Sequence, residues 1–282
     1  MTSPRFAQAT ESGRFYNIPG HEDTVFKSVT NLLGSLSKPA LVPAAAKRVG
    51  ERAVFQEMEW HAIQQEKGDE EARKWISRAS HDYMTYKQNL GSAVHFCCEV
   101  FEEHVISEPE FLAFDDYLIA YLNDHWTPKM SEYRGTVAKN IELIRKHVVQ
   151  YERACREHGI VWLDRERTVF NEAMGYAGTL DGIVEIDGTK YIIDIKTGFV
   201  SRDSVPLQLA AYRFATGEVH GDSSRGRRQL VDGGLVLQLL PASYKLLPVA
   251  CGADEFGAFL DVMKVWEWQN GMSKTAIGEE WL

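Results

Sequence analysis

The chain has 282 residues, of which 44% are hydrophobic and 25% charged, a composition typical of a globular protein with one substantial core. Its net charge of −9 excludes a protein whose whole surface binds nucleic acid, although a local basic groove remains compatible with it. No apolar run approaches the roughly 20 residues of a membrane span, and no secretory segment opens the chain, so we expect a cytoplasmic protein without membrane contact.

Cysteine spacing argues against a metal cluster built on thiolates. The chain contains no C-x-x-C pair, and two of its four cysteines are adjacent in a predicted helix. Adjacent helical side chains point about 100° apart, which disfavours a four-cysteine iron–sulfur cluster. We therefore expect no such cluster and interpret the cysteines as buried free thiols: Cys97, Cys98, Cys155 and Cys251.

The first 158 residues are predicted to be mostly helical. Residues 1–23 show no periodicity and are expected to be irregular, with the folded part beginning within 24–36. Apolar residues at helical spacing then predict helices, the last of which Gly159 ends. Their predicted ranges are 44–60, 68–87, 91–105, 111–123 and 131–158.

After residue 158 the pattern changes to that of β-strands. Asp187-Gly188, between two β-branched runs, predicts a tight hairpin. Helices followed by strands predict an α/β fold, with a central mixed sheet of about five strands flanked by helices. We expect residues 1–158 and 159–282 to form one integrated domain. The predicted elements are strands at 160–170, 175–186 and 190–196, a helix at 207–216, a basic loop at 221–228, a hairpin of 234–240 with 244–249, and a helix at 254–270.

Two acids and a lysine are predicted at the ends of neighbouring strands. Asp194 and Lys196 are two apart in one strand, so their side chains point to the same face. A carboxylate and an ammonium beside an isoleucine-rich run are costly to bury unless they are paired or metal-bound. With Asp181 and the backbone carbonyl of Ile195, they would suit Mg²⁺ or Mn²⁺ and metal-assisted phosphodiester hydrolysis, with Lys196 stabilising charge on the phosphate. The plainer alternative is a surface ion pair.

These residues stand in an order that resembles a known nuclease superfamily. Gly178-Thr-Leu-Asp181-Gly, Asp194-Ile-Lys196-Thr-Gly and Gln208-Leu-Ala-Ala-Tyr212 follow one another, with Gly91-Ser-Ala-Val-His95 upstream. The pattern is similar to the PD-(D/E)XK superfamily, in particular to its RecB-like exonuclease branch and the small bacteriophage exonucleases within it. Leucine rather than proline precedes Asp181, which is a departure from the usual motif.

The resemblance implies a restriction-endonuclease-like core and assigns roles to individual residues. His95, Asp181, Asp194 and the Ile195 carbonyl would bind the cation, and Lys196 would be the catalytic lysine. Glu166 would be an additional site acid, with Glu99 as the competing candidate. Gln208 and Tyr212 would orient the lysine or contact the DNA backbone; an amide and a phenol at the boundary of the core are the alternative.

The implied function is a metal-dependent DNA exonuclease in recombination, repair or phage replication, acting in a bacterial cell or an infected host. DNA is the implied partner, together with a recombination or single-strand-binding protein. Three alternatives stay open: a non-catalytic DNA-end-binding subunit, an endonuclease, and an unrelated α/β protein with a chance motif. The basic loop would either grip phosphates or be a disordered insert, through Arg225, Arg227 and Arg228.

Overall fold

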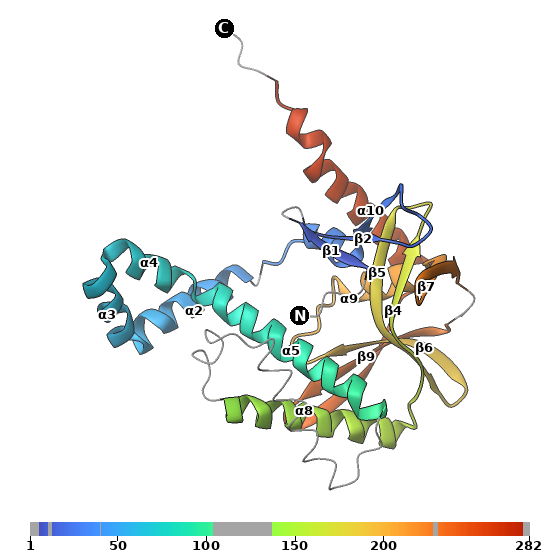
Figure 1. The fold of residues 1–282 in the computed structure, drawn as a ribbon, viewed down its shortest axis with the longest axis horizontal. Coiled ribbons are helices and arrows are strands. Elements are labelled where there is room, and N and C mark those ends of the chain that lie inside the picture. Colours follow the sequence, from blue (N-terminus) through green and yellow to red (C-terminus); the bar gives the residue numbers. More distant parts are fainter. Residues whose placement is uncertain (1–5, 11–12, 40, 104–136, 228–230, 279–282) are drawn as a thin grey trace. The chain divides into compact units, whose positions relative to one another are not determined.

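The computed structural model describes residues 6–10, 13–39, 41–103, 137–227 and 231–278 (Figure 1). The chain forms two compact units, which we name the helical unit, residues 37–148, and the sheet unit, residues 2–36 together with 149–282. The boundary between them falls inside helix α8, Val137–His158. No helix in the described ranges is both long enough and apolar enough to cross a membrane.

The helical unit is held by apolar stripes and one buried ion pair. Arg52 is almost fully buried; its Nη1 lies 2.7 Å from Asp82 Oδ2 and also donates to the carbonyl of Trp75. Tyr86 donates to Asn140 across 3.1 Å, which ties α8 to the middle of the unit. The other helices of this unit are α2 (Leu41–Phe55), α3 (Glu57–Lys67), α4 (Asp69–Ser77) and α5 (Ala79–Glu103).

Helix α5 differs from the prediction because it does not begin at Gly91. It starts at Ala79 and runs through the glycine without a break. Leu90 and Val94, on either side of Gly91, are both buried, so packing of one continuous stripe outweighs the unfavourable helix propensity of a single glycine. The predicted helix 131–158 is confirmed from residue 137 onward, and the predicted helix 111–123 lies outside the described residues.

The sheet unit contains a mixed sheet of ten strands, which corrects the prediction of about five. The main path through the sheet is β1-β2-β3-β5-β4-β7-β8, and β6, β9 and β10 branch from β5: β6 pairs with β5 and β9, and β9 pairs with β10. The strands are β1 (Ala7–Thr10), β2 (Gly13–Asn17), β3 (Val25–Ser28), β4 (Val161–Asn171), β5 (Tyr176–Ile186), β6 (Thr189–Lys196), β7 (Gly217–His220), β8 (Ser223–Gly226), β9 (Gly233–Leu240) and β10 (Ser243–Val249).

The predicted hairpin at Asp187-Gly188 is confirmed. It joins β5 to β6, and both turn residues have positive φ, +50° and +77°, as a two-residue type I′ turn requires. Strand β6 then pairs in parallel with β9, after a connection that contains helix α9, Val205–Arg213. The hairpin β9–β10 is confirmed as well.

Two predicted irregular regions contain strands. Within residues 1–23, β1 and β2 form an antiparallel hairpin, and Tyr16 and Ile18 are buried with Phe26 in a small apolar cluster. Within 221–228, Ser223–Gly226 is strand β8, which pairs with β7. Both were missed because strands of four or five residues are too short for alternation to be recognised.

The main core of the sheet unit lies between the sheet and three helices. Helix α9 contacts both β6 and β9, and α10 packs against α9. Large buried side chains here include Tyr176, Leu209 and Phe259, with the Tyr176 and Phe259 rings in an edge-to-face contact. The remaining elements are α1 (Val29–Leu32), α10 (Ala253–Asn270) and two 3-10 turns, η1 (Leu33–Ser35) and η2 (Met272–Thr275).

Candidate metal centre

Three predicted site acids lie on three adjacent strands of the sheet unit: Glu166 on β4, Asp181 on β5 and Asp194 on β6. The register that pairs Arg165 with Gly182 places Glu166 of β4 opposite Asp181 of β5. A carboxylate oxygen of Glu166 and one of Asp181 lie within 4.8 Å of each other.

The second neighbour of Asp181 comes from β6. The β5–β6 ladder ends at Gly182 and Ile193, and Asp181 and Asp194 are the next residues of the two strands beyond it. Asp181 Oδ2 also accepts the backbone N–H of Ile195 at 2.7 Å, which fixes the carboxylate against the end of β6. The contact of Ile195 is thus through its N–H group, and ligation by its carbonyl stays a prediction.

Lys196 is paired with the buried acid of its own strand. Its Nζ lies 2.7 Å from Asp194 Oδ1, and the two side chains are 31% and 4% exposed. Burial lowers the pKa of the Lys196 ammonium, but the Asp194 and Asp181 carboxylates outweigh that effect, so the pKa is raised from its ordinary value. The lysine is therefore held as a positive charge beside Asp194.

The carboxylate pair fits a hard divalent cation. Two oxygens bound to one ion at about 2.0–2.6 Å lie no more than roughly 4–5 Å apart, and carboxylate oxygens are preferred by Mg²⁺, Mn²⁺ and Ca²⁺. Glu166 and Asp181 meet this condition. Asp194 is not among the carboxylates grouped this closely, and its Oδ1 is engaged by Lys196, so its ligation of the cation stays a prediction.

The predicted polar pair, Gln208 and Tyr212, lies on helix α9. Gln208 Nε2 lies 3.3 Å from the Tyr212 hydroxyl, as residues four apart on one helix face allow. Burial raises the pKa of Tyr212 well above the ordinary tyrosine value, and the Asp194 and Asp181 carboxylates act in the same direction. The phenol consequently stays protonated and can donate a hydrogen bond.

The glycine that opens the sequence motif has a steric role. A Cβ atom built on Gly178 would lie 2.5 Å from Cε1 of Tyr212, closer than real Cβ contacts. Only glycine leaves room for the tyrosine ring of α9 to approach β5 this closely. The glycine of the first motif and the tyrosine of the Gln-x-x-x-Tyr motif therefore pack directly against each other.

A row of hydroxyl groups that sequence reasoning missed lies next to the acids. Thr168 of β4 and Thr179 of β5 face each other. Thr179 stands two residues before Asp181, and Thr168 stands two residues after Glu166. Their hydroxyls are 3.2 Å apart, and Tyr16 adds a third hydroxyl 3.3 Å from Thr179. Because alternate residues of a strand share a face, the sequence could have shown that Thr179 lies on the same face as Asp181. It could not have shown this for Tyr16, which lies in the segment that was expected to be irregular.

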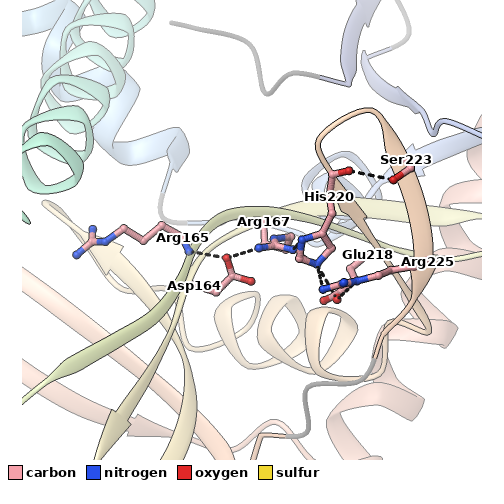
Figure 2. A network of polar contacts seen from close by, with 7 residues as sticks. All are labelled: Asp164, Arg165, Arg167, Glu218, His220, Ser223 and Arg225. Atoms are coloured by element: carbon pink, nitrogen blue, oxygen red, sulfur yellow. Dashed lines mark hydrogen bonds and ion pairs between the residues drawn. The ribbon is translucent and has the colours of Figure 1, made fainter. Parts of the chain in front are cut away.

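The predicted substrate-binding residue Arg225 does not lie in a free basic loop, because it belongs to strand β8 and is bonded to an acid. Figure 2 shows Arg225 and His220 of the β7–β8 hairpin converging on Glu218, with Nε of Arg225 3.1 Å from Glu218 Oε1. Burial raises the pKa of Glu218, but hydrogen bonds from His220 and Arg225 outweigh it, so the pKa is lowered. Arg167 of β4 joins this network by contacting His220. Arg225, at 56% exposed, remains the arginine open to a phosphate.

Arg227 is turned inward. Its Nη1 donates to the carbonyl of Tyr212, while Nε and Nη2 are buried without a hydrogen-bond partner in the described part of the chain. Burial lowers the pKa of this guanidinium. Arg227 thus contacts α9 rather than solvent, and Arg228 lies outside the described residues.

His95 and Glu99 belong to the helical unit. They are one turn apart on α5, both half-buried, beside the buried Cys98. Ligation by His95 therefore stays a prediction, and Glu166 is the acid that the sheet unit itself brings next to Asp181. All four cysteines are described, and none forms a disulfide. Burial raises the pKa of the Cys97 thiol to about 12.

Comparisons with known proteins leave the family open. No family model matches the chain, and the search of curated proteins found no match. A solved structure described as the crystal structure of SSO0001 is similar at 13% identity over 64% of this chain and 85% of that chain, with a TM-score of 0.28. A likeness at that score carries no argument about function.

Proposed function

We propose that this chain is a divalent-metal-dependent deoxyribonuclease that removes nucleotides from DNA ends. The observation that carries the proposal is the juxtaposition of the Glu166 and Asp181 carboxylates within 4.8 Å, with the Asp194–Lys196 pair on the adjoining strand. Carboxylates from neighbouring strands with one fixed ammonium are the groups that metal-assisted phosphodiester hydrolysis needs. The order of the motifs, which resembles the RecB-like exonucleases, supports the same proposal.

In this proposal each side chain has a separate task. Glu166 and Asp181 hold the cation, which when bound activates water and offsets charge on the phosphate. Asp194 positions Lys196, whose ammonium stabilises the negative charge that develops on the scissile phosphate. The Ile195 N–H keeps Asp181 in place. Tyr212 and Gln208, on α9, donate hydrogen bonds behind the acids.

The deciding experiment compares three DNA substrates under three metal conditions. End-labelled single-stranded DNA, end-labelled duplex and a covalently closed circle are incubated with Mg²⁺, Mn²⁺ or a chelator. An exonuclease degrades the linear substrates only when metal is present and leaves the circle intact. Cleavage of the circle would make the enzyme an endonuclease, and absence of cleavage on every substrate would contradict the proposal.

Lys196→Ala tests the role of the lysine. We expect it to reduce the cleavage rate by about 100-fold or more, because a positioned charge that stabilises the transition state is lost. Lys190→Ala is the matched control, since it removes a lysine from the other end of the same strand. Circular dichroism and thermal unfolding show whether both variants are folded. Full activity in Lys196→Ala would remove this lysine from the mechanism.

His95→Ala tests the predicted ligand on α5. If His95 binds the same cation, the variant has weaker Mn²⁺ binding by calorimetry and needs more metal for half-maximal cleavage. Glu99→Gln, one turn along the same helix, separates the two candidates. Unchanged metal binding in His95→Ala would limit the metal site to residues of the sheet unit.

A further inference from the structure

We propose that the loop from β6 to α9, residues 197–204, holds an unpaired nucleotide at the DNA end, with Phe199 stacking on its base. The inference rests on the proposed nuclease function and names its substrate class: DNA ends whose terminal nucleotides have left the duplex stack. Phe199 lies three residues after Lys196, so the loop begins where the candidate metal centre ends.

The exposure of Phe199 is set by how its neighbour packs. Phe199 is 87% exposed, whereas Val200 packs against the main core of the sheet unit. With Val200 held inside, the chain presents Phe199 outward.

Hydrogen bonds fix this loop at both ends. At its start, Gln238 Nε2 donates to the carbonyl of Gly198 across 2.7 Å, and Gln238 is the β9 partner of Lys196. At its end, the backbone N–H of Ser204 reaches the Ser201 hydroxyl, and that of Val205 reaches the Ser201 carbonyl. The aromatic ring is thus carried by a short segment that is fixed next to the catalytic lysine.

An exposed aromatic ring at this place suits a nucleobase. Every base has a π face, so stacking on phenylalanine is tolerant of sequence, as an enzyme that acts on DNA ends in general requires. Inside a duplex both faces of a base are covered by its neighbours, so a base that has left the helix offers Phe199 the face it needs for stacking. Arg202, exposed on the same loop, is placed to contact a nearby phosphate.

Equilibrium binding, measured without cleavage, tests the inference. Fluorescent single-stranded 12-mers are titrated with Lys196→Ala protein with or without Phe199→Ala, and the change in anisotropy is recorded. A second set of oligonucleotides carries a single abasic residue at each of the four positions nearest either end. Phe199→Trp keeps an aromatic ring at the site, and Trp268→Ala removes a different exposed aromatic residue, on α10.

We expect Phe199→Ala to weaken binding of intact oligonucleotides about tenfold, the usual effect of losing one stacked base. On the oligonucleotide that is abasic at the stacked position, proteins with and without Phe199 should bind equally, because the contact is already absent. Phe199→Trp should restore affinity, and Trp268→Ala should leave it unchanged.

Two results would overturn the inference. In one, Phe199→Ala binds intact DNA as tightly as its parent; in the other, it loses the same factor on every abasic oligonucleotide, which indicates general damage and not a lost stack. Failure of the nuclease proposal is seen separately, as absence of metal-dependent cleavage by the unmodified protein. The outcome of the binding experiment therefore does not depend on the outcome of the cleavage experiment.

Discussion

Glu166 adopts a backbone conformation that its residue type disfavours. Its φ is +45°, in the left-handed region, which costs a residue with a long side chain about 1–3 kcal/mol. Asp187 has a similar φ, but it lies in a two-residue turn that demands it. Glu166 is in the middle of β4, where no turn needs this geometry, so we attribute the strain to the placement of its carboxylate beside Asp181.

Replacing Glu166 with asparagine should separate metal binding from stability. Asparagine tolerates left-handed φ and lacks the charge, so we expect a melting temperature without metal equal to or above that of the unmodified protein. Mn²⁺ affinity should fall by about tenfold or more with the loss of a charged ligand. Calorimetry and thermal unfolding measure the two effects, with Glu185→Gln on β5 as the control. A lower melting temperature together with unchanged Mn²⁺ affinity would contradict this account.

Gly178→Ala should displace Tyr212. The added methyl would overlap the tyrosine ring, and such overpacking typically costs about 1–3 kcal/mol of the free energy of unfolding. Urea unfolding measures the loss, and the cleavage rate should fall with it because Gln208 and Tyr212 move. Gly257→Ala in α10 is the matched control: a Cβ there meets nothing within 4 Å, and alanine favours a helix. Equal stability of the two variants would argue against the packing role of Gly178.

At the scale of elements, α8 contains a buried histidine whose charge state is coupled to folding. His147 is almost fully buried, and its Nδ1 lies 2.7 Å from the carbonyl of Leu143. Burial lowers the pKa of His147, and the positive charge of Lys87 acts in the same direction, against the opposing hydrogen bond. The folded chain therefore favours the neutral ring.

The free energy of unfolding should consequently fall in mild acid. The contribution of His147 is fully present above the unfolded pKa of about 6.5 and is lost as the pH falls from there through the lower folded value. Urea unfolding at pH 7.5, 6.5 and 5.5 measures it, at about 1.4 kcal/mol for each unit of lowered pKa. His147→Gln should flatten this dependence, whereas His81→Gln, which changes an exposed histidine of α5, should not. Identical pH profiles for all three proteins would exclude His147 as a cause of the pH dependence of the free energy of unfolding.

Elements with strong local signals were predictable, and those fixed by partners were not. Asp187-Gly188 identifies its hairpin because few residue pairs tolerate two positive φ angles in succession. Strands β1, β3, β7 and β8 have four residues each, which is too short for a period-two pattern to be recognised. Gly91 was interpreted as a helix start because the sequence alone does not show the packing that carries α5 through it.

The same division applies to the candidate site. Asp181, Asp194 and Lys196 were recognisable because the Asp187-Gly188 turn sets the register of β5 against β6, which brings the middle of β5 next to the end of β6. The opposition of Glu166 and Asp181 depends on the register of β4, which is shifted by an irregularity between Trp162 and Asp164 that periodicity does not reveal. The inward turn of Arg227 depends on α9 and was likewise invisible.

For the whole molecule, the sheet unit is built from two stretches of chain separated by the helical unit, residues 37–148. Strand β3 pairs on one side with β2 and on the other with residues Tyr176 and Ala177 of β5. A ribosome that synthesises this chain must therefore release the first three strands long before their partner exists. Until β5 emerges, an unpaired strand edge and the apolar side chains of β2 and β3 face the solvent, which exposes the nascent chain to aggregation.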